Sequence, residues 1–320
     1  MRAFDYARAG DVAEAVGAPA KLIAGGTNLL DLMKLEVETP EALLDITRIG
    51  LNAIDAEGEG LRIGALVSNS DAAADPRIRR DWPLLSRAIL AGASPQLRNK
   101  ATMGGNLCQR TRCGYFMDNR SACNKREPGS GCAAIGGVNR NHAILGTSPD
   151  CIATYPGDMA VALSALQAVV HTERSEGGRE IPMRHFHRLP GDTPHLDNHL
   201  EPGEVITAIS LPAPFGGRQI YRKVRDRASY AFALVSVAAA LRMEEGRIAS
   251  VHLAFGGVAH TPWTNDHVDE LLTGERPSPA LFDKAADLLL EDAQGQGHND
   301  FKIPLLRRAL AAVLAEATGE

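Results

Sequence analysis

The segment from position 101 to position 158 organises the rest of the chain, and it reads ATMGGNLCQRTRCGYFMDNRSACNKREPGSGCAAIGGVNRNHAILGTSPDCIATYPGD. All five cysteines of the 320 residues lie in it, between positions 108 and 151. The charged side chains around them are mostly basic, with Arg110, Arg112, Arg120, Lys125, Arg126 and Arg140 against Asp118, Glu127 and Asp150. Thiols gathered beside a surplus of positive charge predict a site for an anionic, sulfur-ligated group.

The spacing of the cysteines favours an iron–sulfur cluster but leaves two alternatives open. Disulfides are disfavoured because the number of cysteines is odd and residues 1–10 lack the apolar core of a secretory signal. A structural zinc site usually shows a short C-x₂₋₄-C pair, and the only close pair here is Cys108 and Cys113. A cluster needs four thiolates and accepts long, irregular loops between them. Zinc and unligated buried thiols therefore remain the alternatives.

Length and charge narrow the class of protein. A chain of 320 residues is long enough for two or three packed units. A net charge of −5, without any run of basic residues, argues against a nucleic-acid surface. The longest apolar stretch, residues 159–170, is shorter than the about 18 residues of a membrane span. No targeting segment is evident, so we expect a cytoplasmic protein, or a periplasmic one if it is exported with a signal-bearing partner.

Residues 1–60 are predicted to form a small α/β unit. Asp11 is placed to cap a helix over residues 12–16. An apolar strand over 21–24 is followed by the turn Gly25-Gly26-Thr27-Asn28, a helix over 29–34 and a strand over 42–46. A strand, a glycine turn and a helix N-terminus present several backbone N–H groups to a phosphate. Thr27 and Asn28 are the candidate caps of that helix.

Residues 61–215 are predicted to form a second α/β unit. It contains a strand over 61–66, helical segments over 71–74 and 83–93, a glycine turn at 104–105, a helix from 158 and a strand over 168–171. The cysteine segment, about 107–152, is interpreted as a long loop inserted between the glycine turn and the helix that should follow it. A loop of that length in a compact domain is usually functional. Residues 176–215 are expected to be rich in loops.

Residues 218–320 are predicted to be a separate α+β domain. Apolar runs at 232–242 and 247–255, joined by a glycine-containing turn, are typical of a β-hairpin. Apolar residues recur at helical spacing near 267–272, 279–290 and 303–315.

Several motifs in this chain resemble those of a known family. They are Ala24-Gly25-Gly26-Thr27-Asn28-Leu29, Gln96-Leu97-Arg98-Asn99 with Thr102-Met103-Gly104-Gly105-Asn106, Pro156-Gly157-Asp158-Met159, and Phe255-Gly256-Gly257-Val258-Ala259. The chain is similar over essentially its whole length to the FAD-binding (medium) subunits of the xanthine dehydrogenase and carbon monoxide dehydrogenase family, the molybdenum hydroxylases. Residues 106–113, 123–126 and 139–146 resemble one branch, the flavin subunits of periplasmic aldehyde oxidoreductases, which carry an additional [4Fe–4S] cluster in this loop. The flavin subunit of 4-hydroxybenzoyl-CoA reductase has a comparable loop.

The resemblance implies a fold and a role. The fold would be two small α/β subdomains that form a FAD-binding domain of the PCMH or vanillyl-alcohol-oxidase type, followed by the α+β domain. The role would be electron transfer within a heterotrimer. Electrons would pass from a molybdenum-cofactor large subunit and a [2Fe–2S] small subunit, through FAD on this chain, to an external acceptor.

The resemblance also implies which residues hold FAD. Backbone N–H groups of Ala24, Gly25, Gly26, Thr27, Asn28 and Leu29 would bind the pyrophosphate, with the turn extending through Leu30 to Leu32. Thr102, Gly105 and Asn106 would line the other side, and Asp158 would bind the ribityl chain or adjacent groups. Lys223 would lie near the isoalloxazine and stabilise the anionic reduced flavin. Relatives often carry serine where Gly157 stands, so this chain departs from the pattern there.

For the cluster, the resemblance implies Cys113, Cys123, Cys132 and Cys151 as ligands, and Cys108 as a spare thiol packed against the flavin site. His142 is expected to donate a hydrogen bond to a thiolate or sulfide rather than bind iron. His185 and His187 fall on one face if their segment is a strand, but no third metal ligand stands near them.

Two other functions remain as alternatives to a redox subunit. One is a stand-alone flavoprotein oxidase, which is disfavoured because no catalytic acid or base stands beside the predicted flavin loops. The other is a zinc-stabilised interaction domain. No Ser–His–Asp arrangement or pair of carboxylates indicates hydrolase chemistry.

Overall fold

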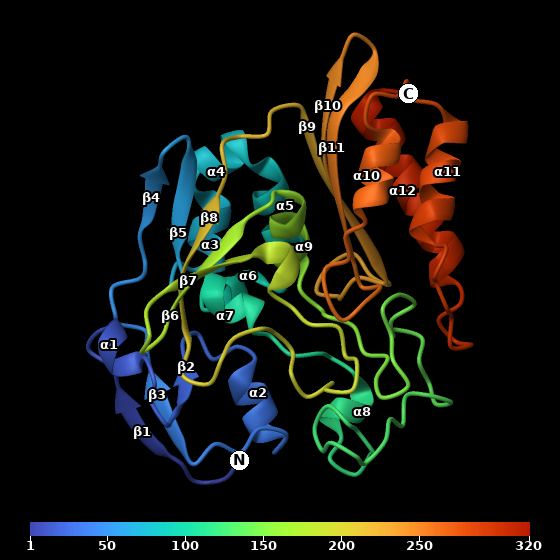
Figure 1. The fold of residues 1–320 in the computed structure, drawn as a ribbon. Coiled ribbons are helices and arrows are strands. Elements are labelled where there is room, and N and C mark those ends of the chain that lie inside the picture. The colour runs from blue at the N-terminus through green and yellow to red at the C-terminus, as the bar shows by residue number, and fades with distance from the viewer.

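The computed structural model places all 320 residues, and its first sheet is a small parallel one at the N-terminus (Figure 1). Its strands are ordered β1-β3-β2 and comprise β1 (Asp5–Arg8), β2 (Lys21–Ile23) and β3 (Ala42–Asp45). Asp11 caps α1 (Val12–Ala15) as predicted, and the glycine turn after β2 leads into α2 (Leu29–Lys34). The predicted strand, glycine turn and helix are therefore confirmed.

A five-stranded antiparallel sheet forms the middle of the molecule. Its order is β4 (Ile54–Glu57), β5 (Gly60–Gly64), β8 (Val205–Leu211), β6 (Val169–Glu173) and β7 (Arg179–Pro182). The central strand, β8, was not predicted. Most of residues 176–215 form loops, as expected, but β8 lies among them. The sequence VITAISL is apolar at five of its positions without alternating strictly, because β8 is buried on both sides.

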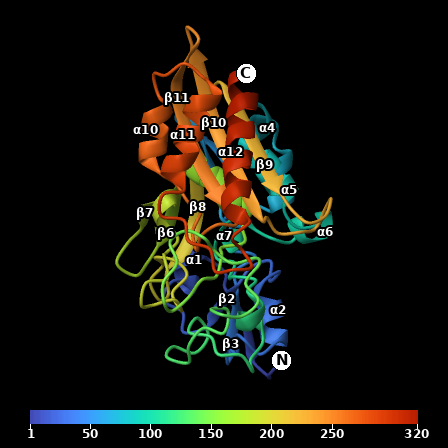
Figure 2. The ribbon, with the colours of Figure 1, turned by 90° about the vertical axis from the view of Figure 1, so that its right-hand side faces the viewer.

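A layer of helices separates this sheet from the C-terminal one (Figures 1 and 2). The layer comprises α3 (Asn69–Ala74), α4 (Pro76–Asp81), α5 (Pro83–Ala91) and α9 (Asp158–Ala165). Every residue of α9 is buried, as its nearly continuous apolar sequence requires. The first hydrophobic core joins the middle sheet to these helices and reaches Ala238 and Ala254 in the C-terminal sheet.

The C-terminal sheet is the predicted hairpin with one additional strand. Its order is β11 (Arg247–Gly256), β10 (Val235–Glu244) and β9 (Arg218–Val224). Glu245 and Gly246 turn the hairpin with φ of 50° and 73°, the conformation that suits a two-residue connection. The outer face is covered by α10 (Asp266–Leu272), α11 (Pro279–Leu289) and α12 (Lys302–Thr318), which confirms the three predicted helices. None of the helices combines the length and the apolarity that crossing a bilayer requires.

The two glycines before the cysteine segment form part of a helix and not a separate turn. After α6 (Pro95–Arg98), Gly104 and Gly105 lie inside α7 (Met103–Leu107), and the Thr102 side chain caps that helix by accepting from the Gly105 N–H. The insertion therefore follows the helix of the glycine turn and does not separate the two. From Cys108 to Gly157 the only helix is α8 (Gly114–Met117), and the segment folds beside the N-terminal unit (Figure 1).

The segment of His185 and His187 is not a strand. Residues Met183–His185 form a 3₁₀ turn, so the two imidazoles do not share a face. His185 is exposed, whereas His187 is buried and its Nε2 contacts the carbonyl oxygen of Leu107 at 2.9 Å. The suggested metal pair is therefore ruled out by the backbone conformation.

Candidate functional site

A large cavity, which we call the central cavity, opens where the N-terminal unit, the cysteine segment and the C-terminal sheet meet. Its volume is about 1500 Å³, larger than the about 300–1,000 Å³ typical of sites for drug-sized ligands. All of the residues predicted to bind FAD line it except Leu30. The lining residues from that set are Ala24, Gly25, Gly26, Thr27, Asn28, Leu29, Leu32, Thr102, Gly105, Asn106, Asp158 and Lys223.

The first glycine turn forms one wall because its backbone packs directly on another backbone. A Cβ atom on Gly25 would lie 1.9 Å from the carbonyl oxygen of Lys100, so only glycine fits there. Gly26 has φ of +71°, and a Cβ atom there would lie 3.0 Å from the side chain of Leu30, which does not line the cavity. This close approach brings the turn against the chain that leads into α7.

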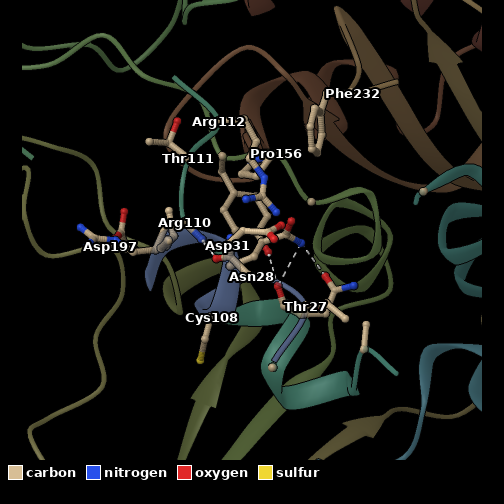
Figure 3. A pocket seen from close by; sticks show the side chains of 18 of the residues that line it. Thr27, Asn28, Asp31, Cys108, Arg110, Thr111, Arg112, Pro156, Asp197 and Phe232 are labelled. Atoms are coloured by element: carbon tan, nitrogen blue, oxygen red, sulfur yellow. Dashed lines mark hydrogen bonds and ion pairs between the residues drawn. The ribbon is translucent and has the colours of Figure 1, made fainter. Parts of the chain in front are cut away.

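The caps predicted for α2 are absent. Neither Thr27 nor Asn28 caps the helix with its side chain, since Asn28 has helical φ and ψ rather than the extended backbone of an N-cap. The Oδ1 atom of Asn28 instead accepts a hydrogen bond from the backbone N–H of Arg110 at 2.9 Å. The first glycine turn is therefore tied to the cysteine segment (Figure 3).

The opposite wall is held by side-chain amides and one tyrosine. Asn106 donates to Asn69 at 2.7 Å and accepts from Gln109 at 2.8 Å. The Tyr155 hydroxyl donates to the carbonyl oxygen of Asn106 at 3.1 Å. A Cβ atom on Gly157 would lie 2.6 Å from the Tyr155 ring. The Tyr155 ring therefore leaves no room for a side chain at position 157.

Asp158 and Lys223 form a buried ion pair on the cavity wall. The Lys223 Nζ donates to Asp158 Oδ2 at 2.8 Å, and the Tyr221 hydroxyl donates to Asp158 Oδ1 at 2.6 Å. The two charged side chains are only 4% and 7% exposed. Burial and the neighbouring carboxylate raise the pKa of Tyr221 well above its usual value, so the phenol stays protonated. Lys223 is thus fixed in position as a cation.

Several buried polar atoms of cavity-lining residues have no partner within the protein, and two of them are an amide and a guanidinium donor. These two donors are Asn28 Nδ2 and Arg112 Nε, although buried polar groups are nearly always hydrogen-bonded. The Arg112 guanidinium lies over the Phe232 ring, 5.6 Å from its centroid (Figure 3). Burial lowers the pKa of Arg112, but arginine stays charged in proteins. Unpaired donors and an exposed aromatic ring fit a ligand with both anionic and aromatic parts.

Four of the cysteines line a second, smaller cavity, which we call the cysteine pocket. They are Cys113, Cys123, Cys132 and Cys151. All five cysteines are free thiols, and an antiparallel bridge joins the backbones of Cys123 and Cys132. Cys113 and Tyr115 line both the cysteine pocket and the central cavity, so the two sites adjoin. Cys108 lies apart from the four; it faces the central cavity and is exposed rather than buried as expected.

The surroundings of the cysteine pocket are positively charged and hydrogen-bonded. Lys125, with a side chain 2% exposed, donates to Asp197 at 2.6 Å and lowers the pKa of Cys151 by its charge, although other contacts raise that pKa overall. His142 Nε2 lies 3.1 Å from Cys113 Sγ, as the expected hydrogen bond requires. No three His, Cys, Asp or Glu side chains converge on one point as the ligands of a single metal ion would.

Sequence reasoning missed three residues of these sites. Arg112 was noted only as part of the basic surplus, and His260, whose Nε2 lies 3.2 Å from Cys151 Sγ, was not singled out. Arg110 was likewise not recognised as a link between distant segments, although it pairs with Glu38 at 2.6 Å and Asp197 at 2.7 Å. The partners stand between 72 and 109 residues apart in the chain, so no local motif signals them.

Two family models together match nearly the whole chain. The model described as the FAD binding domain in molybdopterin dehydrogenase matches residues 2–214, and the CO dehydrogenase flavoprotein C-terminal domain matches residues 219–317. The chain is 53% identical, over 100% of both chains, to the aldehyde oxidoreductase FAD-binding subunit of Escherichia coli (strain K12). It is 27% identical to the carbon monoxide dehydrogenase medium chain of Afipia carboxidovorans, over 98% of each chain.

Solved structures show the same fold. The carbon monoxide dehydrogenase of Hydrogenophaga pseudoflava superimposes with a TM-score of 0.77 and 26% identity, covering 99% of this chain and 97% of that one. These matches confirm the resemblance seen in the motifs and the predicted mixed α/β fold class. The chain therefore belongs to the family of FAD-binding subunits of the molybdenum hydroxylases.

Proposed function

We propose that this chain is the electron-transfer flavoprotein subunit of a molybdenum-containing aldehyde oxidoreductase. In this proposal FAD occupies the central cavity, and Cys113, Cys123, Cys132 and Cys151 hold a [4Fe–4S] cluster in the cysteine pocket. The observation that carries the proposal is the position of Cys113, whose side chain lines both cavities. A cofactor bound by this thiol adjoins a cofactor bound in the central cavity.

The residues of the central cavity bind and orient FAD, which supplies one- and two-electron chemistry. The backbone of the first glycine turn, held against Lys100, presents N–H groups to the pyrophosphate. Asn28 and Arg112 offer two donors that have no partner within the protein. The ion pair with Asp158 fixes the position of the Lys223 ammonium group at the cavity wall.

The cysteine pocket suits a cluster better than zinc. A tetrahedral zinc site needs its donors within about 2.3 Å of one point, and no group of side chains here is arranged so. A cluster binds each thiolate at a different iron, so the four sulfurs lie around a larger object. The buried Lys125 offsets part of the negative charge of four thiolates.

The similarity to known subunits supports a substrate class and a set of partners. The Escherichia coli relative is named as a subunit of an aldehyde oxidoreductase, and its identity of 53% over both full chains supports the same substrate class here. The proposed partners are a molybdenum-cofactor large subunit and a [2Fe–2S] small subunit. These partners oxidise the aldehyde, and this chain passes the electrons on to an external acceptor.

The proposal is tested by metal analysis and absorption spectra of the anaerobically purified chain. We expect one flavin and about four irons per chain, with flavin bands near about 450 nm above broad iron–sulfur absorption, both bleached by dithionite. The chain alone should not oxidise aldehydes, whereas the reconstituted heterotrimer should. Aldehyde turnover by the chain alone would favour the stand-alone oxidase.

Two matched cysteine variants locate the cluster. We expect Cys132→Ser to lose most of its iron and Cys108→Ser to keep it, because only Cys132 lies in the cysteine pocket. One zinc per chain in place of iron would overturn the cluster and leave the flavin assignment standing. Equal loss of iron in both variants would overturn the choice of ligands.

A further inference from the structure

Two imidazoles contact the cysteine pocket, each at a different thiol. His142 Nε2 lies 3.1 Å from Cys113 Sγ, and His260 Nε2 lies 3.2 Å from Cys151 Sγ. His142 belongs to the cysteine segment, whereas His260 follows β11 in the C-terminal part of the chain. Both imidazoles are buried, with 6% and 7% of the residue exposed. Cys123 and Cys132 have no such partner.

The position of the proton on each ring follows from the other nitrogen. Nδ1 of His142 and Nδ1 of His260 are both buried without any hydrogen-bond partner. A neutral imidazole carries one N–H, and burying that N–H without an acceptor costs more than pairing it. The proton therefore belongs on Nε2 in both residues. Each ring then points an N–H at a sulfur.

Residues at and just before the start of α12 bind the backbone of His142 and that of Gly257, three residues before His260. Lys302, which is fully buried, donates from Nζ to the carbonyl oxygens of His142 at 3.0 Å and Gly257 at 2.8 Å. Asn299 donates to the carbonyl oxygen of His142 at 3.2 Å. Lys302 thus links the backbone at His142 to the backbone at Gly257, three residues before His260. The two imidazoles are held in place by the fold and not by the sulfur contact alone.

We propose that His142 and His260 donate Nε2–H hydrogen bonds to the thiolates of Cys113 and Cys151 and thereby raise the reduction potential of the cluster. This inference rests on the proposed [4Fe–4S] cluster. One-electron reduction makes the cluster and its thiolates more negative, so an N–H donor to sulfur stabilises the reduced form more than the oxidised one. No proton is transferred in this step. The histidines are positioning residues that act through the sulfur atoms.

The test is a redox titration of the iron-loaded protein, in the heterotrimer, monitored by the paramagnetic signal of the reduced cluster. We expect His142→Leu and His260→Leu each to shift the reduction equilibrium several-fold toward the oxidised cluster, a tenfold shift corresponding to about 59 mV for one electron. His260→Gln, which places an amide N–H near the position of Nε2, should restore most of the potential. Unchanged potentials in both leucine variants would overturn the inference.

His187→Leu is the matched control. His187 is also buried with an unpartnered Nδ1, but its Nε2 contacts the carbonyl oxygen of Leu107 rather than a sulfur. Its substitution should leave the cluster potential unchanged, and a shift equal to that of His260→Leu would show an unspecific effect and overturn the assignment.

Two further measurements distinguish failure of this inference from failure of the proposed cluster. The iron content of the wild-type protein is measured before any potential, and a wild type without iron would overturn the cluster itself. If a leucine variant loses its iron, its potential cannot be compared with that of the wild type. The hydrogen bonds are then tested by the frequencies of the Fe–S(Cys) vibrations in the wild type. They should shift on exchange into D₂O if N–H groups bind the sulfurs, and the absence of a shift would refute the hydrogen bonds.

Discussion

The central cavity is shaped by backbone in short strands and helices, whereas the cysteine pocket is shaped by side chains in a segment with almost no regular structure. Much of the cavity wall comes from the turn after β2, from α7, from the first residue of α9 and from β9, and the cysteine segment supplies another part of it. The pocket walls depend on contacts such as Arg126 to the carbonyl oxygens of Tyr115 and Phe116, at 2.9 and 2.8 Å. Backbone held in sheets and helices keeps its shape without a ligand. A long irregular loop gains much of its order from what its ends bind.

The largest effect is expected at the first glycine turn. Gly25→Ala would place a Cβ atom 1.9 Å from the carbonyl oxygen of Lys100, where only backbone could move aside. We expect loss of bound FAD and a fall in unfolding free energy of about 4 kcal/mol or more, since overlap with rigid backbone is among the most damaging substitutions. Flavin content and thermal unfolding measure both.

Gly114→Ala is the control for that change. Gly114 lies in the cysteine segment, has no positive φ, and a Cβ atom there meets nothing within 4 Å. We expect wild-type flavin content and stability. If Gly25→Ala matched this control, the close backbone contact would not shape the cavity.

Removing the proposed cluster should disorder the cysteine segment and leave most of the central cavity folded. We expect Cys123→Ala, which removes a buried thiol that we propose as a ligand, to make residues 108–157 sensitive to protease and to accelerate their amide exchange at least about tenfold. FAD should remain bound, because most of the cavity wall does not depend on the thiols. Mass mapping of the cleavage sites tests this, with Cys108→Ala as the control. Cleavage confined to other regions would contradict it.

Arg110 joins the cysteine segment to Glu38 and Asp197. Its removal should have an intermediate effect on the free energy of unfolding. Arg110→Met would leave Glu38 without this partner and Asp197 paired only with Lys125. Because the side chains are about one-fifth exposed, we expect a loss of about 2 kcal/mol, below the about 3–5 kcal/mol for breaking a fully buried pair. Urea unfolding at neutral pH measures it. The control Arg120→Met removes an arginine 91% exposed and should change nothing measurable.

The same network predicts a pH dependence. Burial alone would raise the pKa of Asp197, but the charges of Lys125 and Arg110 outweigh it and hold that pKa below the usual value. A carboxyl whose pKa is lower in the folded chain than in the unfolded chain stabilises the fold at pH values above its unfolded pKa, which is about 3.9. This stabilisation is lost as the pH falls through the pKa of the folded state. The wild type should therefore be more stable than Arg110→Met at neutral pH. We expect this difference in unfolding free energy to become smaller as the pH is lowered below about 4. A constant difference across that window would contradict the assignment.

The smallest effect is expected at Lys223. Lys223→Gln removes the fixed cation at the cavity wall and should shift the two-electron reduction equilibrium of the flavin by about tenfold, or about 30 mV, toward the oxidised form. Arg225→Gln is the control, because Arg225 shares the carbonyl oxygen of Ala91 with Lys223 but does not line the cavity. Equal flavin potentials in the two variants would remove Lys223 from the proposed flavin site.

Much of the fold was predictable because its signals are local. The turn of Gly25 and Gly26, the C-terminal hairpin and the three helices after it each show their periodicity or turn residues within a short window. β8 was missed because a strand buried on both sides lacks the alternation that marks a half-exposed one. The position of Gly104 and Gly105 inside α7 was missed because glycine usually marks the end of a helix and not its first turn.

The sequence by itself determined the family, the glycine turns, and which residue types gather in the cysteine segment, since each of these is written in neighbouring residues. The resemblance also singled out Cys113, Cys123, Cys132 and Cys151, whereas only the tertiary structure decided that Cys113 lines both cavities. The tertiary structure also decided that His260 reaches Cys151, and that Lys302 reaches the carbonyl oxygen of His142, from the far end of the chain. The physical reason is that a hydrogen bond or an ion pair depends on distance in space, and in a folded chain residues more than a hundred positions apart lie within 3 Å of each other.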